Sequence, residues 1–145
     1  MMNGKDFLIT ARFLQRNGKK EADFRSIISR AYYACYLVTR DIAKKACYDN
    51  ARKKALGKMR HENLVTYLKN HGPTLNVKML GTDLGSLQAR RNCADYAMSE
   101  TITSLLANKA VEDADAFLSA LAEISIDDIV KAVENYYINV VSPNM

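Results

Sequence analysis

Apolar residues recur along this chain at the spacing of about 3.6 residues that one face of an α-helix requires. The longest such run contains Phe24, Ile27, Ile28, Ala31, Cys35, Val38 and Ile42. No stretch alternates apolar and polar residues between turn signals, as a half-buried strand would. The pattern therefore predicts an all-α protein, an up-and-down bundle of four to five main helices with a short helix at the C-terminal end.

Start and stop signals refine where these helices lie. The His71–Pro73 stretch marks a helix end, and Ser125 is a candidate N-cap, because the aspartates that follow it suit the helix dipole. We expect the second helix to form the centre of the core. The predicted helices run from about Asp6 to Gln15, Glu21 to Cys47, His61 to Asn70, Thr82 to Asn108 and Val111 to Ile124, with a last short helix after Ser125.

Length and composition narrow the class of protein. A chain of 145 residues can bury one core of several helices, so we expect a single domain over residues 1–145. No apolar run approaches the roughly 20 residues that cross a bilayer, and the first residues lack the apolar core of a signal peptide. We therefore expect a cytoplasmic protein without a membrane segment. Cys35, Cys47 and Cys93 have no paired spacing, which predicts reduced thiols, with Cys35 buried.

Charge is unevenly distributed along the chain. The net charge is +5, but residues 40–60 hold eight basic residues against two acidic ones, and residues 112–134 hold seven acidic residues against one lysine. The basic segment could follow a phosphate backbone, or it could be a solvated helix end and loop. The acidic segment would repel nucleic acid and suits a basic protein partner.

An arginine interrupts an apolar stripe on the predicted helix from Thr82. At 100° per residue, Arg91 lies near the middle of a sector that also contains Leu84, Leu87, Ala94, Met98, Ile102 and Leu105. Burying an unpaired guanidinium is costly, and Asp95 at i+4 is the nearest partner. Arg91 and Asp95 are therefore either a structural ion pair or the floor of a cleft that faces phosphate, with Tyr96 at its border.

A second cluster lies on the long helix, where Arg30 and Tyr33 share a face and are expected near Arg91. Tyr32 and Tyr36 are expected to pack at a helix seam, with their hydroxyls reaching water. His61 is either a boundary residue or the best available proton carrier, and His71 is interpreted as a helix-end residue without function.

Several chemistries lack their motifs. There is no G-x-x-x-x-G-K or G-x-G-x-x-G loop for phosphate, no H-E-x-x-H helix and no nucleophile elbow. The two histidines are too few for a histidine-rich metal site. The sequence therefore predicts neither a metal nor a cofactor.

Four stretches of sequence resemble the HEPN family, named for a nucleotide-binding domain of higher eukaryotes and prokaryotes. They are RSIISRAYYACYLVTRDIA, RHENLVTYLKN, LQARRNCADYAMS and AVEDADAFLSALAEI. The chain looks closest to small single-domain prokaryotic members whose motif ends in Ala-Asp-Tyr, over about Phe7 to Ile124. The resemblance implies a helical bundle, usually a homodimer, with a site where motif-bearing helices of two protomers meet.

The resemblance also implies an activity. Many HEPN proteins are metal-independent endoribonucleases of toxin–antitoxin or phage-defence systems, commonly encoded beside a minimal nucleotidyltransferase that acts as antitoxin. Arg91 and Asn92 match the start of their ribonuclease motif, but Tyr96, Ala97 and Met98 stand where its histidine would fall. Either His61 supplies the proton transfer from a neighbouring helix, or Tyr96 does so with help from Arg91, or the protein binds without cutting. Tyrosine is a poor base at neutral pH.

Two functions are therefore expected. The first is an RNA-acting toxin or defence protein with a composite site at a homodimer cleft. Its candidate residues are Arg91, Asn92, Asp95, Tyr96 and His61 for catalysis, and Arg30, Tyr33, Arg52, Lys53 and Lys54 for binding. The second is a catalytically inactive module that binds a nucleotide or docks a partner such as a nucleotidyltransferase, through the same cleft or the acidic C-terminal helices.

Overall fold

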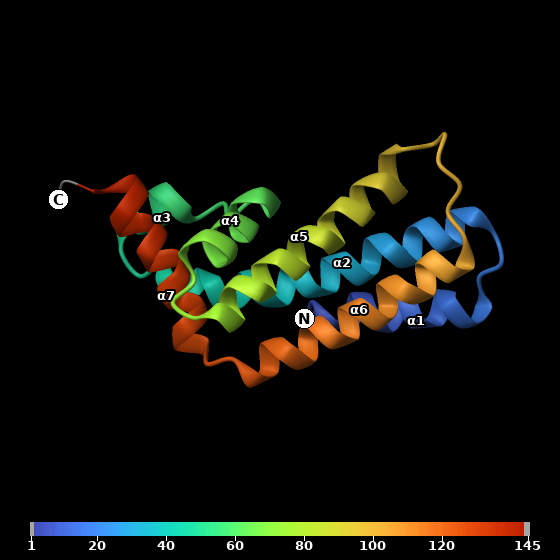
Figure 1. Cartoon of the computed structure of the whole chain (residues 1–145), viewed down its shortest axis with the longest axis horizontal. Coiled ribbons are helices and arrows are strands. Elements are labelled where there is room, and N and C mark those ends of the chain that lie inside the picture. Colours follow the sequence, from blue (N-terminus) through green and yellow to red (C-terminus); the bar gives the residue numbers. More distant parts are fainter. Residues whose placement is uncertain (1, 144–145) are drawn as a thin grey trace. The chain divides into compact units, whose positions relative to one another are not determined.

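The computed structural model describes residues 2–143, and Figure 1 shows the helices in chain order. No strand occurs in these residues, which confirms the predicted all-α class. The helices are α1 (Lys5–Asn17), α2 (Glu21–Ala43), α3 (Asn50–Leu56), α4 (His61–His71), α5 (Leu75–Tyr96), α6 (Ser104–Glu123) and α7 (Ile126–Tyr136). A 3₁₀ turn, η1 (Lys44–Ala46), follows α2, and a π turn, η2 (Tyr137–Val141), follows α7. No helix of the described part is long and apolar enough to cross a membrane.

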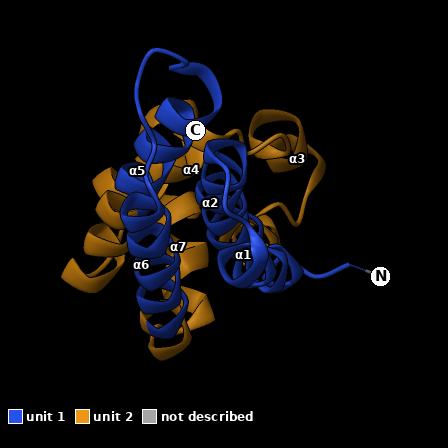
Figure 2. Cartoon of the chain, turned by 90° about the vertical axis from the view of Figure 1, so that its right-hand side faces the viewer, with its two compact units in different colours: residues 1–38, 84–119 blue, residues 39–83, 120–145 orange. Residues whose placement is uncertain are grey.

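The chain forms two compact units, which Figure 2 shows in different colours. Unit 1 comprises residues 1–38 and 84–119, and unit 2 comprises residues 39–83 and 120–145. The boundaries fall within α2, α5 and α6. Each unit is therefore built from two segments that are distant in sequence.

Unit 1 packs four helical segments against one another, from α1, α2, α5 and α6. Arg12 of α1 pairs with Asp115 of α6, and the thiol of Cys35 on α2 donates to the carbonyl of Ala114 on α6. Cys35 is fully buried, as predicted, and the three cysteines are free. Tyr32 is also fully buried, with its ring stacked on that of Tyr36 at 5.9 Å. The expectation that its hydroxyl reaches water was wrong, because the ring lies inside the core.

Unit 2 is organised around the packing of α4 against α7. The rings of Tyr67 and Tyr136 lie 4.6 Å apart, and Asn135 Nδ2 donates to the carbonyl of His71 at 3.0 Å. Gly81 allows the first part of α5 to approach α4, because a Cβ at this position would overlap the backbone of Lys69. The side chain of Ser125 accepts from Asp128 N–H, which confirms the predicted N-cap of α7.

The predicted bounds of two helices were wrong. The helix expected from Thr82 to Asn108 begins earlier, at Leu75, and covers α5 up to Tyr96, a non-helical segment over residues 97–103, and the first turn of α6. The helix expected from Val111 begins at Ser104. Thr103 Oγ1 accepts from Leu106 N–H and so starts a new helix where the apolar period alone continues the old one. Met98 and Leu105, which were placed on the apolar stripe, are 68% and 77% exposed.

Helix α3 was not predicted from the sequence. This helix lies within the basic segment, and Asp49 caps it by accepting a hydrogen bond from Arg52 N–H at 2.8 Å. A helix of seven residues spans only two turns, so its apolar period is too short to recognise. The basic segment is therefore partly an ordered helix with its own cap.

Candidate functional site

Arg91 lies near the end of α5, in unit 1, and its guanidinium contacts three side chains. Its Nη2 donates to Tyr33 Oη at 2.8 Å, and its Nη1 donates to Asn92 Oδ1 at 3.1 Å. Its Nε lies 2.8 Å from Asp95 Oδ2, an ion pair at i+4 in which the buried Nε is not aligned for a hydrogen bond. The predicted Arg91–Asp95 pair is thus present, together with a second partner on α2.

Two aromatic rings flank this guanidinium. Its central carbon lies 5.1 Å from the ring centre of Tyr33 and 5.6 Å from that of Tyr96, both within the range of a cation–π contact. The Arg91 side chain is only 14% exposed, whereas Tyr96 is 70% exposed. We call Arg91, Asn92, Asp95, Tyr33 and Tyr96 the Arg91 cluster. It combines a shielded cation with an aromatic ring that faces solvent.

Arg91 retains hydrogen-bonding capacity. A guanidinium carries five N–H groups, and within the described residues only one on each terminal nitrogen of Arg91 has a hydrogen-bond acceptor. Asp95 is half-buried and also accepts from Ser29 Oγ at 3.3 Å. The remaining terminal N–H groups can therefore bind one further acceptor, such as a phosphate oxygen, without loss of the internal contacts.

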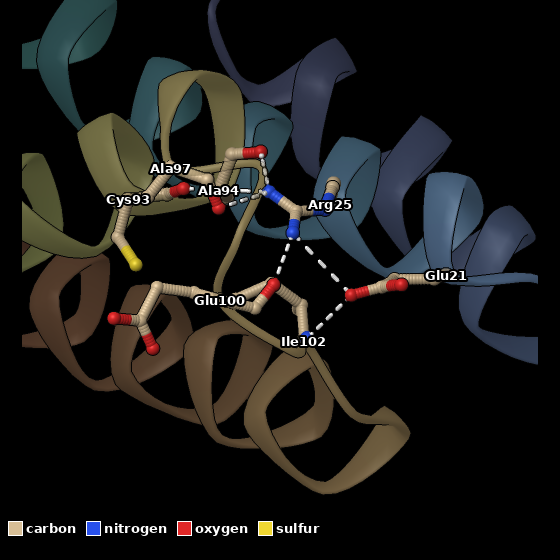
Figure 3. A network of polar contacts seen from close by, with 7 residues as sticks. All are labelled: Glu21, Arg25, Cys93, Ala94, Ala97, Glu100 and Ile102. Atoms are coloured by element: carbon tan, nitrogen blue, oxygen red, sulfur yellow. Dashed lines mark hydrogen bonds and ion pairs between the residues drawn. The ribbon is translucent and has the colours of Figure 1, made fainter.

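Arg25 holds the end of α5 in place, as Figure 3 shows. From α2, its Nη1 donates to the carbonyls of Ala94 at 2.9 Å and Ala97 at 3.2 Å, and its Nη2 donates to the carbonyl of Glu100. Glu21 pairs with Arg25 and accepts from Ile102 N–H at 2.7 Å. These contacts satisfy carbonyls that the end of a helix leaves without partners.

This role of Arg25 was not predicted from the sequence. The spacing of Glu21 and Arg25 at i+4 is the one local signal of an ordered side chain, and it equally fits an exposed helix pair. The carbonyl partners lie about seventy residues away in sequence, so only the packing of α2 against α5 brings them together. The Ile102 N–H also lowers the pKa of Glu21, which keeps this carboxylate charged.

The other candidate residues of unit 1 differ in whether they contact Arg91. Tyr33 lies against Arg91 as predicted, whereas Arg30 is half-buried and makes no hydrogen bond or ion pair with the Arg91 cluster in the described part of the chain. Asn92 and Tyr96 are exposed on α5. The structure therefore brings together one of the two residues that were expected to approach Arg91 from α2.

The remaining candidates belong to unit 2. His61 is the first residue of α4 and is half-buried, and Lys53 and Lys54 are exposed on α3. Both histidines of the chain, His61 and His71, lie in unit 2. Unit 1 therefore contributes no histidine of its own to the Arg91 cluster, and the proton-transfer role of His61 stays a prediction.

Arg52 is bound to two carboxylates. Its Nη1 donates to Asp49 Oδ2 at 2.6 Å and its Nε donates to Glu134 Oε1 at 2.8 Å, while its central carbon lies over the rings of Tyr48 and Tyr137 at 4.6 and 4.5 Å. The hydrogen bond to Glu134 contributes most to the raised pKa of Arg52. We call these five residues the Arg52 cluster. Its cation is already neutralised, which departs from the expected role as a phosphate ligand.

No group of three or more potential metal ligands occurs in the described residues. No protein-family model matches this chain, and no curated protein or solved structure matches it at a significant level. The resemblance to the HEPN family therefore depends on the sequence motifs alone and stays a prediction.

Proposed function

We propose that this chain is an RNA-acting protein of the HEPN type, a toxin or defence component, in which Arg91 binds a phosphate of the RNA. The observation that supports this most is the set of contacts that the Arg91 guanidinium makes. The guanidinium lies within cation–π distance of the rings of Tyr33 and Tyr96, yet each terminal nitrogen keeps an N–H group for another acceptor. A pre-oriented guanidinium with unused N–H groups suits the oxygens of a phosphate.

Tyr96 adds a second element of RNA recognition. Single-stranded RNA is commonly bound by stacking of its bases on aromatic rings beside a cation. Tyr96 is exposed, and its ring lies against the guanidinium of Arg91. We therefore assign to Tyr96 the stacking of a base next to the phosphate that Arg91 binds. Asp95 keeps Arg91 oriented rather than contacting the RNA.

Cleavage needs a proton carrier in addition to Arg91. The proposed catalytic form is a homodimer in which His61 supplies the imidazole that the motif lacks. In this form the RNA 2′-hydroxyl gives its proton to His61 and attacks the scissile phosphorus, while Arg91 neutralises charge on the phosphate oxygens. The P–O5′ bond breaks, and the products are a 2′,3′-cyclic phosphate and a 5′-hydroxyl that takes up a proton. The reaction requires no metal ion.

A second function is favoured by two specific observations. Asp95 already compensates the charge of Arg91, and unit 1 contains no histidine. Both suit a catalytically inactive HEPN module that binds a nucleotide or docks a partner such as a minimal nucleotidyltransferase. The same Arg91 cluster would then bind phosphate without cutting RNA.

The test is cleavage of total cellular RNA by the purified protein in EDTA. If the first function is right, the wild-type protein cuts RNA, and Arg91→Ala lowers the rate by at least about 100-fold, as expected when a group that stabilises transition-state charge is removed. His61→Ala lowers it by a similar factor if His61 carries the proton. Arg90→Ala is the matched control, because Arg90 lies on the same helix and pairs with Asp113 instead.

Binding distinguishes the two functions if no cutting occurs. An inert protein that binds labelled RNA or nucleotide, and loses that binding in Arg91→Ala but not in Arg90→Ala, supports the inactive module. Equal behaviour of all variants in both cleavage and binding would contradict any role of Arg91 in handling RNA or nucleotide.

A further inference from the structure

A small polar pocket lies at the corner between α3 and α4, in unit 2. It encloses about 230 Å³ and is lined among others by Lys54, Lys58, Arg60, Glu62 and Tyr67. Because a water molecule occupies about 30 Å³ of liquid, this volume has room for a phosphate group and some of its hydration. We call it the corner pocket.

The backbone at the corner explains why basic side chains converge there. The N–H of Gly57 donates to the carbonyl of Lys53 and ends α3, and Met59 then adopts a φ of 36°. This left-handed conformation is uncommon for a residue with a side chain, and here the side chain of Met59 is buried. Lys58 and Arg60 stand on either side of Met59, and both line the pocket.

The charges of this pocket are not compensated. None of Lys54, Lys58 and Arg60 has a carboxylate within ion-pair distance among residues 2–143, whereas nearby Arg52 has two. Glu62 is the one acidic residue of the lining. The pocket therefore keeps an excess of positive charge.

The start of α4 lies at the same pocket. Arg60 is the residue that precedes α4, and its side chain makes no capping hydrogen bond. The amides in the first turn of a helix lack intrahelical acceptors and carry a partial positive charge. Glu62 and Asn63 of this turn line the pocket. Burial raises the pKa of Tyr67 to about 12, so its phenol stays neutral and does not repel an anion.

We propose that the corner pocket binds a phosphate group, with Lys58 and Arg60 as its principal ligands and Lys54 beside them. The ligand is a phosphate ester, either of an RNA backbone or of a free nucleotide. The affinity of the pocket for phosphate does not depend on the function proposed above. The use of the pocket in holding RNA does rest on the function proposed above, because the RNA bound there would be the RNA on which the protein acts at Arg91.

The test is titration of the full chain, labelled with ¹⁵N, with inorganic phosphate at constant ionic strength set by chloride. We expect saturable shifts of the amide signals of residues 58–63. The double variant Lys58→Ala/Arg60→Ala should weaken binding at least about tenfold, because each charged hydrogen bond to phosphate is worth about that factor. Arg60→Lys should retain most of the affinity, since it keeps the charge.

The matched control is Lys5→Ala/Lys19→Ala, which removes the same charge from exposed positions of unit 1. It should change phosphate affinity less than twofold. Shifts of the same size in the Lys58/Arg60 variant, at an unchanged Tm, would overturn the proposal, as would the absence of any saturable shift in the wild-type protein.

Competition distinguishes the two sources of phosphate. Displacement of phosphate by a short RNA without terminal phosphates assigns the pocket to an RNA backbone, and displacement by AMP but not by this RNA assigns it to a free phosphate ester. Both results keep the phosphate site. Failure of the proposed function gives a different result. In that case Arg91→Ala leaves RNA cleavage and RNA binding unchanged, while the pocket still binds phosphate.

Discussion

Arg91 in unit 1 and Arg52 in unit 2 have similar surroundings, but their guanidiniums differ in the acceptors that they bind. Both guanidiniums lie over two tyrosine rings, and their side chains are 14% and 18% exposed. Arg52 makes hydrogen bonds to two carboxylates, whereas Arg91 has one carboxylate, in poor alignment, and two neutral acceptors. Burial and aromatic contacts are therefore alike for the structural arginine, Arg52, and for the candidate binding residue, Arg91. The two arginines differ in the number and alignment of their charged acceptors.

The difference also concerns what each arginine connects. Arg52 joins α3 to α7, since Asp49 caps α3 and Glu134 belongs to α7. Arg91 makes polar contacts with two residues of its own helix and with one of α2. Loss of Arg52 thus removes a tertiary connection and leaves two carboxylates without their cation, whereas loss of Arg91 leaves Asp95 with its Ser29 contact.

The largest expected effect on stability follows from Arg52→Ala. We expect it to lower Tm by about 10 °C, because Glu134 and Asp49 lose their common partner and α3 loses its connection to α7. Thermal unfolding followed by circular dichroism measures this shift. Arg16→Ala, at an exposed position of α1, is the matched control and should change Tm by less than about 2 °C. A shift for Arg52→Ala no larger than that of the control would contradict a structural role.

A smaller effect is expected from Arg25→Met, which sharpens the description of unit 1. Methionine keeps much of the side-chain volume but cannot donate to the carbonyls of Ala94, Ala97 and Glu100, so we expect a loss of about 2 kcal/mol in the free energy of unfolding. Hydrogen exchange should become faster for residues 93–102 before other parts of unit 1. Unchanged exchange in this segment would show that Arg25 does not hold the end of α5.

The smallest expected effect is a pH dependence that originates in the Arg52 cluster. The N–H of Arg52 holds the pKa of Asp49 below its ordinary value of 3.8, so Asp49 stabilises the fold above that pH and loses this contribution as the pH falls further. Denaturant unfolding between pH 5 and about pH 2 should therefore show a shallower decline for Asp49→Asn than for the wild-type protein. Parallel declines would contradict this assignment.

Much of the fold follows from the sequence because the apolar period is strong where helices are long. The predicted bounds of α1, α2 and α4 agree with the structure to within a few residues, and the N-cap at Ser125 was read from side-chain chemistry alone. The prediction of one continuous helix from Thr82 to Asn108 was wrong, because the capping hydroxyl of Thr103 starts a new helix although the apolar pattern continues. Helix α3 was missed for the opposite reason, since it is too short to show a pattern.

The candidate site was predictable mainly where its contacts are local, although the approach of Tyr33 from α2 to Arg91 was also predicted. The i+4 spacing of Arg91 and Asp95 predicts their ion pair, and the resemblance directs attention to Tyr96. The partners of Arg25 and Arg52 come from distant segments, so the sequence could not show that one holds α5 and the other is neutralised. Local net charge was a poor guide to phosphate-binding residues for the same reason. It counts Arg52, which is paired with two carboxylates, in the same way as Arg60, which has no ion pair within the described residues.

The most direct measurement compares two conservative variants, Arg91→Lys and Arg52→Lys, in a titration with labelled single-stranded RNA below the Tm of both. Lysine keeps the charge but lacks the paired donors of a guanidinium. We predict that Arg91→Lys weakens RNA binding at least about tenfold with a small change in Tm, while Arg52→Lys lowers Tm and leaves the affinity of the folded protein unchanged. Equal RNA affinity of Arg91→Lys and the wild-type protein, or a loss confined to Arg52→Lys, would contradict the assignment of Arg91 as the RNA site.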